Sequence, residues 1–128
     1  MRKLILISFL SIFAMLLTCG SAQAHHGSRA YYDMSKAISM TGTVTNFAWQ
    51  NPHVYVLFDV TDTQGHVEHW AAETYSITVL ERNNGWTRHT LKPGETITIT
   101  LWKAKNGSPR GYISKVAAGG QSYVITTH

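Results

Sequence analysis

Cysteine is almost missing from this 128-residue chain: there is only one, Cys19, and it lies near the N-terminus. A domain formed by the rest of the chain therefore has no disulfide, and side-chain packing must stabilise it. Charged side chains are also scarce, at 14 %, and lysine and arginine form no dense cluster. Nucleic-acid-binding domains usually carry such a basic patch, so we expect no nucleic-acid partner.

A long apolar run occurs only near the N-terminus, at residues 4–17. Its 14 residues are fewer than the roughly 20 that a membrane-spanning helix needs. Basic residues precede the run, and the small residues of 21–24 follow it. This arrangement predicts a signal peptide at residues 1–24 that is cleaved after Ala24. The mature protein is then expected in the bacterial periplasm or outside the cell, without a transmembrane segment.

Two other readings of this N-terminal segment stay open. It could remain uncleaved as an anchor, or Cys19 could be lipidated. Thr18 disfavours lipidation, because that position normally holds Gly, Ala or Ser. Cleavage after Ala24 leaves 104 residues, with nine basic and seven acidic side chains and a formal charge of +2. This length suits one domain with a modest core.

Hydrophobic patterning predicts an extended N-terminal arm at residues 25–35 and one β domain at 36–128. Alternating apolar residues and turn signals divide that domain into strands. One short helix is expected after Ser76, and it should end at the Asn-Asn-Gly of 83–85. The expected strands cover residues 36–49, 53–62, 66–73, 96–101, 112–118 and 122–126.

The first five strands and the helix follow the order β-β-β-α-β-β, and the sixth is the expected hairpin partner of the fifth. This order is typical of a five-stranded OB-like barrel, an all-β fold with one short helix. A small open β-sandwich or roll is the alternative. Strand alternation assigns an apolar face to the core, and two tryptophans are expected to join it. The predicted core residues are Val44, Val56, Phe58, Trp70, Trp86, Ile97, Ile99 and Leu101.

Short motifs recur in a fixed order along the mature chain: His25-His26-Gly27-Ser28, Gly42-x-Val44, Trp49-x-Asn51-Pro52-His53, Trp70-x-x-Glu73, Gly85-Trp86 and Leu91-x-Pro93-Gly94. In this combination the chain resembles the DUF6152 family, which consists of small secreted bacterial proteins of uncharacterised function. The resemblance implies export and one mature domain, but no reaction. One departure is Glu95, where the family commonly has Asp, and it preserves the charge.

All seven histidines lie in the mature chain. Cleavage after Ala24 would expose His25, whose α-amine and imidazole Nδ1 can chelate one metal ion. A further imidazole completes the three-nitrogen arrangement that Cu(II) favours, and His26 and His53 are the candidates. In another arrangement the amine, an amide and His26 bind Cu(II) in a square plane. Cleavage one residue earlier would also give a copper motif, Ala24-His25-His26.

Other histidines are weaker candidates for metal ligands. Strand alternation directs His66 and His69 to opposite faces, so they cannot easily share a metal ion. A polar arm that merely follows the cleavage site is the plain explanation of His25-His26. His53 could likewise have a purely structural role, in which its imidazole caps the end of a strand or forms a hydrogen bond to backbone.

Large aromatic side chains suggest a different kind of binding site. On the surface of an OB-like barrel, such rings can stack on sugars or bases. The candidates are Trp49 and Trp102, and Asn51 lies in the rigid Asn-Pro step beside Trp49. The same side chains could instead serve the core.

Features of catalysis are few, since the mature chain has no cysteine nucleophile, phosphate loop or HExxH motif. Glu68 and Glu73 have an odd spacing that does not suit an acid/base pair on one strand face. The sequence therefore favours an exported, non-enzymatic binding domain that takes copper at His25-His26. The alternatives are a barrel that binds a small envelope ligand or partner through its aromatics without metal, and a copper-dependent redox enzyme.

Overall fold

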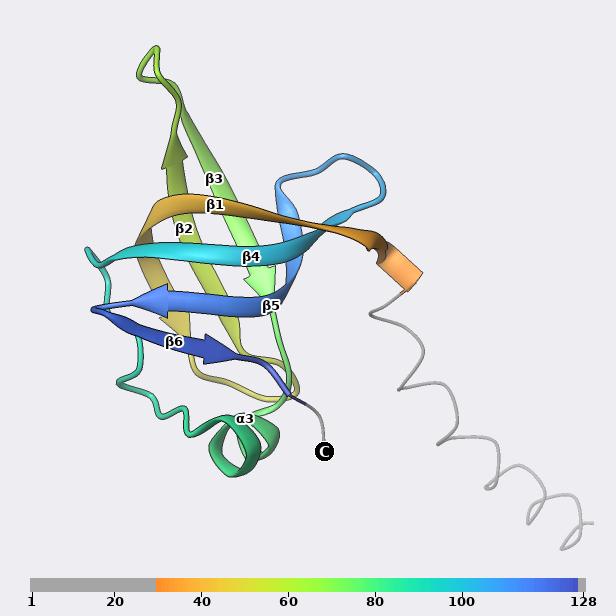
Figure 1. Ribbon diagram of the computed structural model, residues 1–128, viewed down its shortest axis with the longest axis vertical. Coiled ribbons are helices and arrows are strands. Elements are labelled where there is room, and N and C mark those ends of the chain that lie inside the picture. The colour runs from red at the N-terminus through yellow and green to blue at the C-terminus, as the bar shows by residue number, and fades with distance from the viewer. Residues whose placement is uncertain (1–29, 127–128) are drawn as a thin grey trace, which may run out of the picture. The chain divides into compact units, whose positions relative to one another are not determined.

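A computed structural model describes residues 30–126 of the chain (Figure 1). The predicted signal peptide and the histidines His25 and His26 lie outside the described residues. Six strands and one helix follow in the expected order: β1 Tyr32–Ala48, β2 Tyr55–Thr61, β3 Val67–Glu73, α3 Ile77–Asn84, β4 Thr96–Ala104, β5 Arg110–Ala118 and β6 Gln121–Val124.

The strands lie in the order β3-β2-β1-β4-β5-β6, and each is antiparallel to its neighbour. A parallel pairing between β3 and β5, from Ala71 opposite Arg110 to Glu73 opposite Tyr112, joins the two sides of the sheet. Five strands thereby form a closed barrel, with β6 outside it as the hairpin partner of β5. The predicted OB-like barrel is confirmed. Closure also protects the paired ends of β3 and β5 from pairing with other chains.

Strand β1 is longer than the sequence predicted, because it begins at Tyr32 and not at Lys36. Its register with β4 is irregular between Tyr32 and Ala37. Within this irregular stretch, Asp33 Oδ1 accepts hydrogen bonds from the backbone N–H of Ser35, at 3.0 Å, and from its hydroxyl, at 2.6 Å. This local turn explains why the segment has no strand periodicity, and residues 32–35 of the expected arm belong to the barrel.

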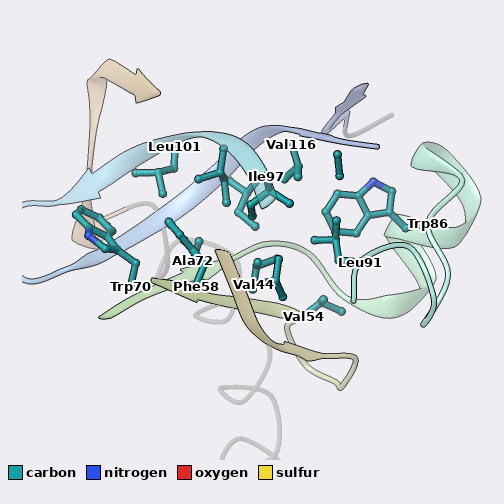
Figure 2. Packing of buried hydrophobic residues seen from close by; sticks show 14 of the residues in the cluster. Val44, Val54, Phe58, Trp70, Ala72, Trp86, Leu91, Ile97, Leu101 and Val116 are labelled. Atoms are coloured by element: carbon teal, nitrogen blue, oxygen red, sulfur yellow. The ribbon is translucent and has the colours of Figure 1, made fainter. Parts of the chain in front are cut away.

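Buried side chains from all five barrel strands fill the interior (Figure 2). The residues predicted for the core are all buried there, including both tryptophans. Phe58 and Trp70 stack with ring centroids 6.2 Å apart. The alternation of isoleucine and threonine in β4 thus separates the core from the surface, as the sequence indicated.

Helix α3 lies between β3 and β4 and buries Leu80. Ser76 occupies its N-cap position without a side-chain hydrogen bond. The side chain of Asn51 serves instead, since its Oδ1 accepts the backbone N–H of Ile77 at 3.2 Å. Gly85 ends the helix in the left-handed conformation, at φ 66°, as expected for a glycine at this position.

Candidate binding site at the end of strand β3

A buried carboxylate, that of Glu73, marks the point where β3 ends. Glu73 lies opposite Tyr55 on β2 and opposite Tyr112 on β5, at the parallel pairing that closes the barrel. The hydroxyl of Tyr55 donates to Glu73 Oε2 at 3.0 Å. His53 Nδ1 lies 3.8 Å from the same oxygen. The fold therefore joins a histidine predicted as a metal ligand to a carboxylate.

Two tyrosine hydroxyls stay protonated beside this carboxylate. Burial, followed by the negative charge of Glu73, raises the pKa of Tyr32 above its ordinary value, and a hydrogen bond with Glu73 adds to the shift. Burial and the hydrogen bond to Glu73 also raise the pKa of Tyr55, and Arg110 opposes the shift. At neutral pH both tyrosines are therefore hydrogen-bond donors, which a buried carboxylate needs.

Aromatic rings extend the site along β5. The ring of Tyr112 lies 5.7 Å from that of Tyr32 and 5.6 Å from that of Tyr75, edge-on. Trp102 stacks on Tyr112 from the other neighbouring strand, at 6.4 Å. Trp102 is half-buried, and Tyr112 connects this predicted ligand-binding residue to the tyrosines around Glu73.

The other two predicted ligand-binding residues lie in a different group of contacts. Trp49 packs against Phe47 at 5.5 Å, and Phe47 contacts the core residue Trp86 at 5.9 Å. Asn51 holds the N-terminus of α3. Both residues thus have structural partners, and only Trp102 adjoins the aromatic cluster at β5.

Exposed histidines on the β2–β3 hairpin have separate partners. His66 Nδ1 lies 3.1 Å from Asp62 Oδ2, and His69 Nδ1 lies 2.6 Å from Asp59 Oδ1. Within residues 30–126, no three histidine, cysteine or acidic side chains gather closely enough to hold a metal ion.

Glu73 itself was not among the binding residues predicted from the sequence. The spacing between Glu68 and Glu73 argued only against an acid/base pair formed by the two. In the structure they accept hydrogen bonds from different residues, since Glu68 Oε2 accepts the Trp70 indole N–H at 2.7 Å. The alternation that buries Trp70 and Ala72 directs Glu73 to the other face, where exposure is expected. The one feature of the sequence that singled out Glu73 was the Trp70-x-x-Glu73 motif.

The fold and this cluster define a class, that of small OB-like barrel domains with a polar and aromatic site at the β3–β5 closure. Within that class the chain belongs to the DUF6152 family, a family of unknown function, whose sequence profile matches residues 14–114. The resemblance seen in the motifs is thus confirmed.

Among solved structures, the chain is similar to the mitochondrial single-stranded DNA binding protein Rim1 of S. cerevisiae. Sequence identity is 9 %, the TM-score is 0.44, and the match covers 66 % of this chain and 94 % of the other. No curated protein sequence matches the chain. In the described part of the chain, no helix has the length and apolar character to span a membrane.

Proposed function

We propose that the protein is an exported, non-enzymatic domain that binds Cu(II) at the N-terminus created by signal-peptide cleavage. In this proposal, His25 supplies its α-amine and Nδ1, and His26 or His53 supplies a further imidazole. Nitrogen ligands of this kind in a planar arrangement suit Cu(II).

One observation carries the proposal. His53 Nδ1 lies 3.8 Å from Glu73, and the ring of Tyr32, the first residue of β1, contacts that of Tyr112, which lies opposite Glu73. The chain that precedes β1 therefore joins the barrel through a residue of this cluster. Six peptide units separate His26 from Tyr32, and an extended segment of that length reaches at most ~20 Å. The proposal requires that a segment of this length lets His25 and His26 approach His53.

The exposure of His53 also supports a role in binding. Its side chain is 34 % exposed, so that the ring is held at the barrel surface but remains open to a ligand. His66, by contrast, is 76 % exposed on the hairpin and pairs with an aspartate four residues away. His66 is therefore the natural control for a histidine that has no part in the site.

A copper titration of the mature protein tests the proposal. Protein purified from the periplasm should bind one Cu(II) tightly, with nitrogen hyperfine structure in its EPR spectrum. An additional glycine in front of His25 should weaken binding strongly, because it removes the chelate of amine and imidazole. The variant His53→Gln should weaken binding if His53 is the further ligand, while His66→Gln should leave it unchanged.

Equal affinity with and without the additional glycine would refute the N-terminal site. Turnover of a reductant with oxygen or peroxide, absent in the glycine variant, would instead favour a copper-dependent redox enzyme. The glycine variant is needed there as a control, because loosely bound copper also reacts with reductants.

A second candidate function rests on the aromatic cluster. Trp102 is half-buried and is held by the buried ring of Tyr112, and a partly exposed indole fixed in this way can stack on a sugar ring or another flat ligand. Tryptophan fluorescence during titration with envelope oligosaccharides would test this function. Trp102→Phe should reduce the response, whereas Trp49→Phe should retain the binding affinity.

A further inference from the structure

We infer that two copies of this chain pair edge to edge through strand β6, antiparallel and about a two-fold axis. β6 is the outermost strand of the sheet, because the closure of the barrel joins β3 to β5 and leaves β6 outside (Figure 1). This strand contributes no residue to the proposed copper site, so the inference is independent of copper binding.

Successive residues of β6 direct their backbone N–H and C=O groups toward β5 and away from it in turn. Ile125, just after the strand, donates its N–H to the carbonyl oxygen of Ser114 on β5 at 2.8 Å, and Tyr123 has the same orientation two residues earlier. Ser122 and Val124 therefore present their backbone groups to the opposite side, where the described part of the chain offers them no hydrogen-bond partner. We call these two residues the open edge.

Thr126, the next residue that faces outward, shows what kind of group this side of the strand accepts. Its N–H donates to Asn84 Oδ1 at 2.8 Å, and its carbonyl oxygen accepts from Asn84 Nδ2 at 3.3 Å. A carboxamide offers the same donor and acceptor as a peptide group, so Asn84 takes the place of a neighbouring strand at this position. Asn84 thereby closes this end of the described strand and limits the open edge to Ser122 and Val124.

The open edge is also held in a fixed shape. The ring of Tyr123 packs edge-on against the buried Trp86, with ring centroids 5.7 Å apart. Gly119 and Gly120 join β5 to β6 with φ of 56° and 79°, as the two central residues of a tight hairpin turn require. A strand that is ordered beforehand loses little conformational entropy when it pairs.

A second copy of the chain matches the open edge completely. Ser122 and Val124 lie on either side of Tyr123, so a two-fold axis at Tyr123 places Ser122 of each copy opposite Val124 of the other. Each of these pairs exchanges two hydrogen bonds, which satisfies every outward N–H and C=O of the open edge. Pairing stops at Thr126, because Asn84 already bonds to it.

Charge also favours a second copy as the partner. Edge strands that avoid pairing usually carry lysine, proline or a bulge, and residues 121–126 include no charged side chain and no proline. Lys115 on β5 lies opposite Val124, but in the dimer the two copies of β5 would be about 14 Å apart, which is three strand spacings. Pairing would also cover Val124, whose side chain is exposed.

Sedimentation velocity of the mature protein over a series of concentrations tests the inference. The wild type should form a dimer as the concentration rises. Hydrogen exchange should then slow at the amides of Ser122 and Val124, whereas the amide of Tyr123, which faces β5 in both states, should not change.

Two variants of Val124 test the strand pairing itself. Val124→Pro removes an N–H that β5 does not use, so the hairpin should stay intact while the dimer dissociation constant rises about tenfold or more. Val124→Lys adds the charge that natural edge strands use against pairing and should also weaken the dimer. Val67→Lys is the matched control, because Val67 is a similarly exposed valine on another strand, and its dimer should equal that of the wild type.

Circular dichroism confirms that each variant is folded, and Val124→Lys keeps the test decisive if the proline variant unfolds. A wild type that stays monomeric up to millimolar concentration would overturn the inference. A dimer that forms equally well in Val124→Pro and Val124→Lys would also overturn it, because the contact would then lie on another surface.

Discussion

Gly42 lies in the middle of β1, paired with Ile97 of β4, and its backbone does not need a glycine. In a strand, replacing glycine by alanine usually stabilises a protein by about 0.4–1 kcal/mol, because it reduces the freedom of the unfolded chain. In this barrel we expect the opposite effect, so that Gly42→Ala destabilises the protein. A Cβ atom at Gly42 would lie 2.6 Å from the carbonyl oxygen of Asp59 and 2.9 Å from Cδ2 of Phe58.

The contact with Asp59 decides how much stability Gly42→Ala loses. A side chain can rotate away, but this oxygen belongs to the backbone of β2, which pairs with both β1 and β3. Extra methyl groups in packed interiors cost roughly 1–3 kcal/mol. After subtraction of the gain in the unfolded state, Gly42→Ala should lower the free energy of unfolding by about 1–2 kcal/mol. For a domain of this size, the melting temperature should fall by roughly 4–16 °C.

Urea unfolding followed by circular dichroism measures this effect. Thr43→Val, an exposed change on the same strand, should alter stability by less than about 0.5 kcal/mol. In a Phe58→Leu background the ring contact is gone, yet Gly42→Ala should still destabilise because the Asp59 oxygen remains. A Gly42→Ala protein as stable as the wild type, or more so, would refute the close approach of β1 and β2.

Three further predictions concern the core, the tyrosines and export. Phe58→Ala and Ile99→Ala each empty a fully buried position and should cost roughly 2–5 kcal/mol; unchanged melting temperatures in both would mean that the strand faces are misassigned. Because its folded-state pKa is raised, Tyr32 contributes stability that is complete below its ordinary pKa of about 10 and is lost as the pH rises toward the folded value. Absorbance at 295 nm should show less tyrosinate near pH 11 than after denaturation, and Tyr32→Phe should narrow that difference. Intact mass of periplasmic protein should give a chain that begins at His25; retention of the segment ending at Ala24 would refute the export prediction.

Local patterns in the sequence determined most of the fold. Isoleucine and threonine alternate in β4, and this period of two indicates a strand with one buried face whatever its partners are. Asn-Asn-Gly ended α3 for a similarly local reason, since Gly85 adopts a left-handed conformation that other residues avoid. The motifs identified the family because each is a short stretch of residues that can be read without knowing the fold.

Local patterns did not determine where β1 begins. The strand starts at Tyr32, which pairs with Ala104 of β4, but the next residues show no alternation, and there the Asp33 side chain bonds locally to Ser35. The close contact between β1 and β2 was equally absent from the sequence pattern, since only the pairing of the two strands brings Gly42 against the Asp59 carbonyl.

The candidate site depended on tertiary structure most of all. The sequence suggested His53 as a ligand, but it gave no partner for it in the barrel and assigned Glu73 to an ordinary strand face. Glu73 meets Tyr55 through the β2–β3 pairing and Tyr112 through the closure of β3 on β5. Contacts between residues so far apart in the chain arise from strand register and barrel closure. Neither leaves a periodic trace in the sequence, so only the folded chain could bring the carboxylate to His53.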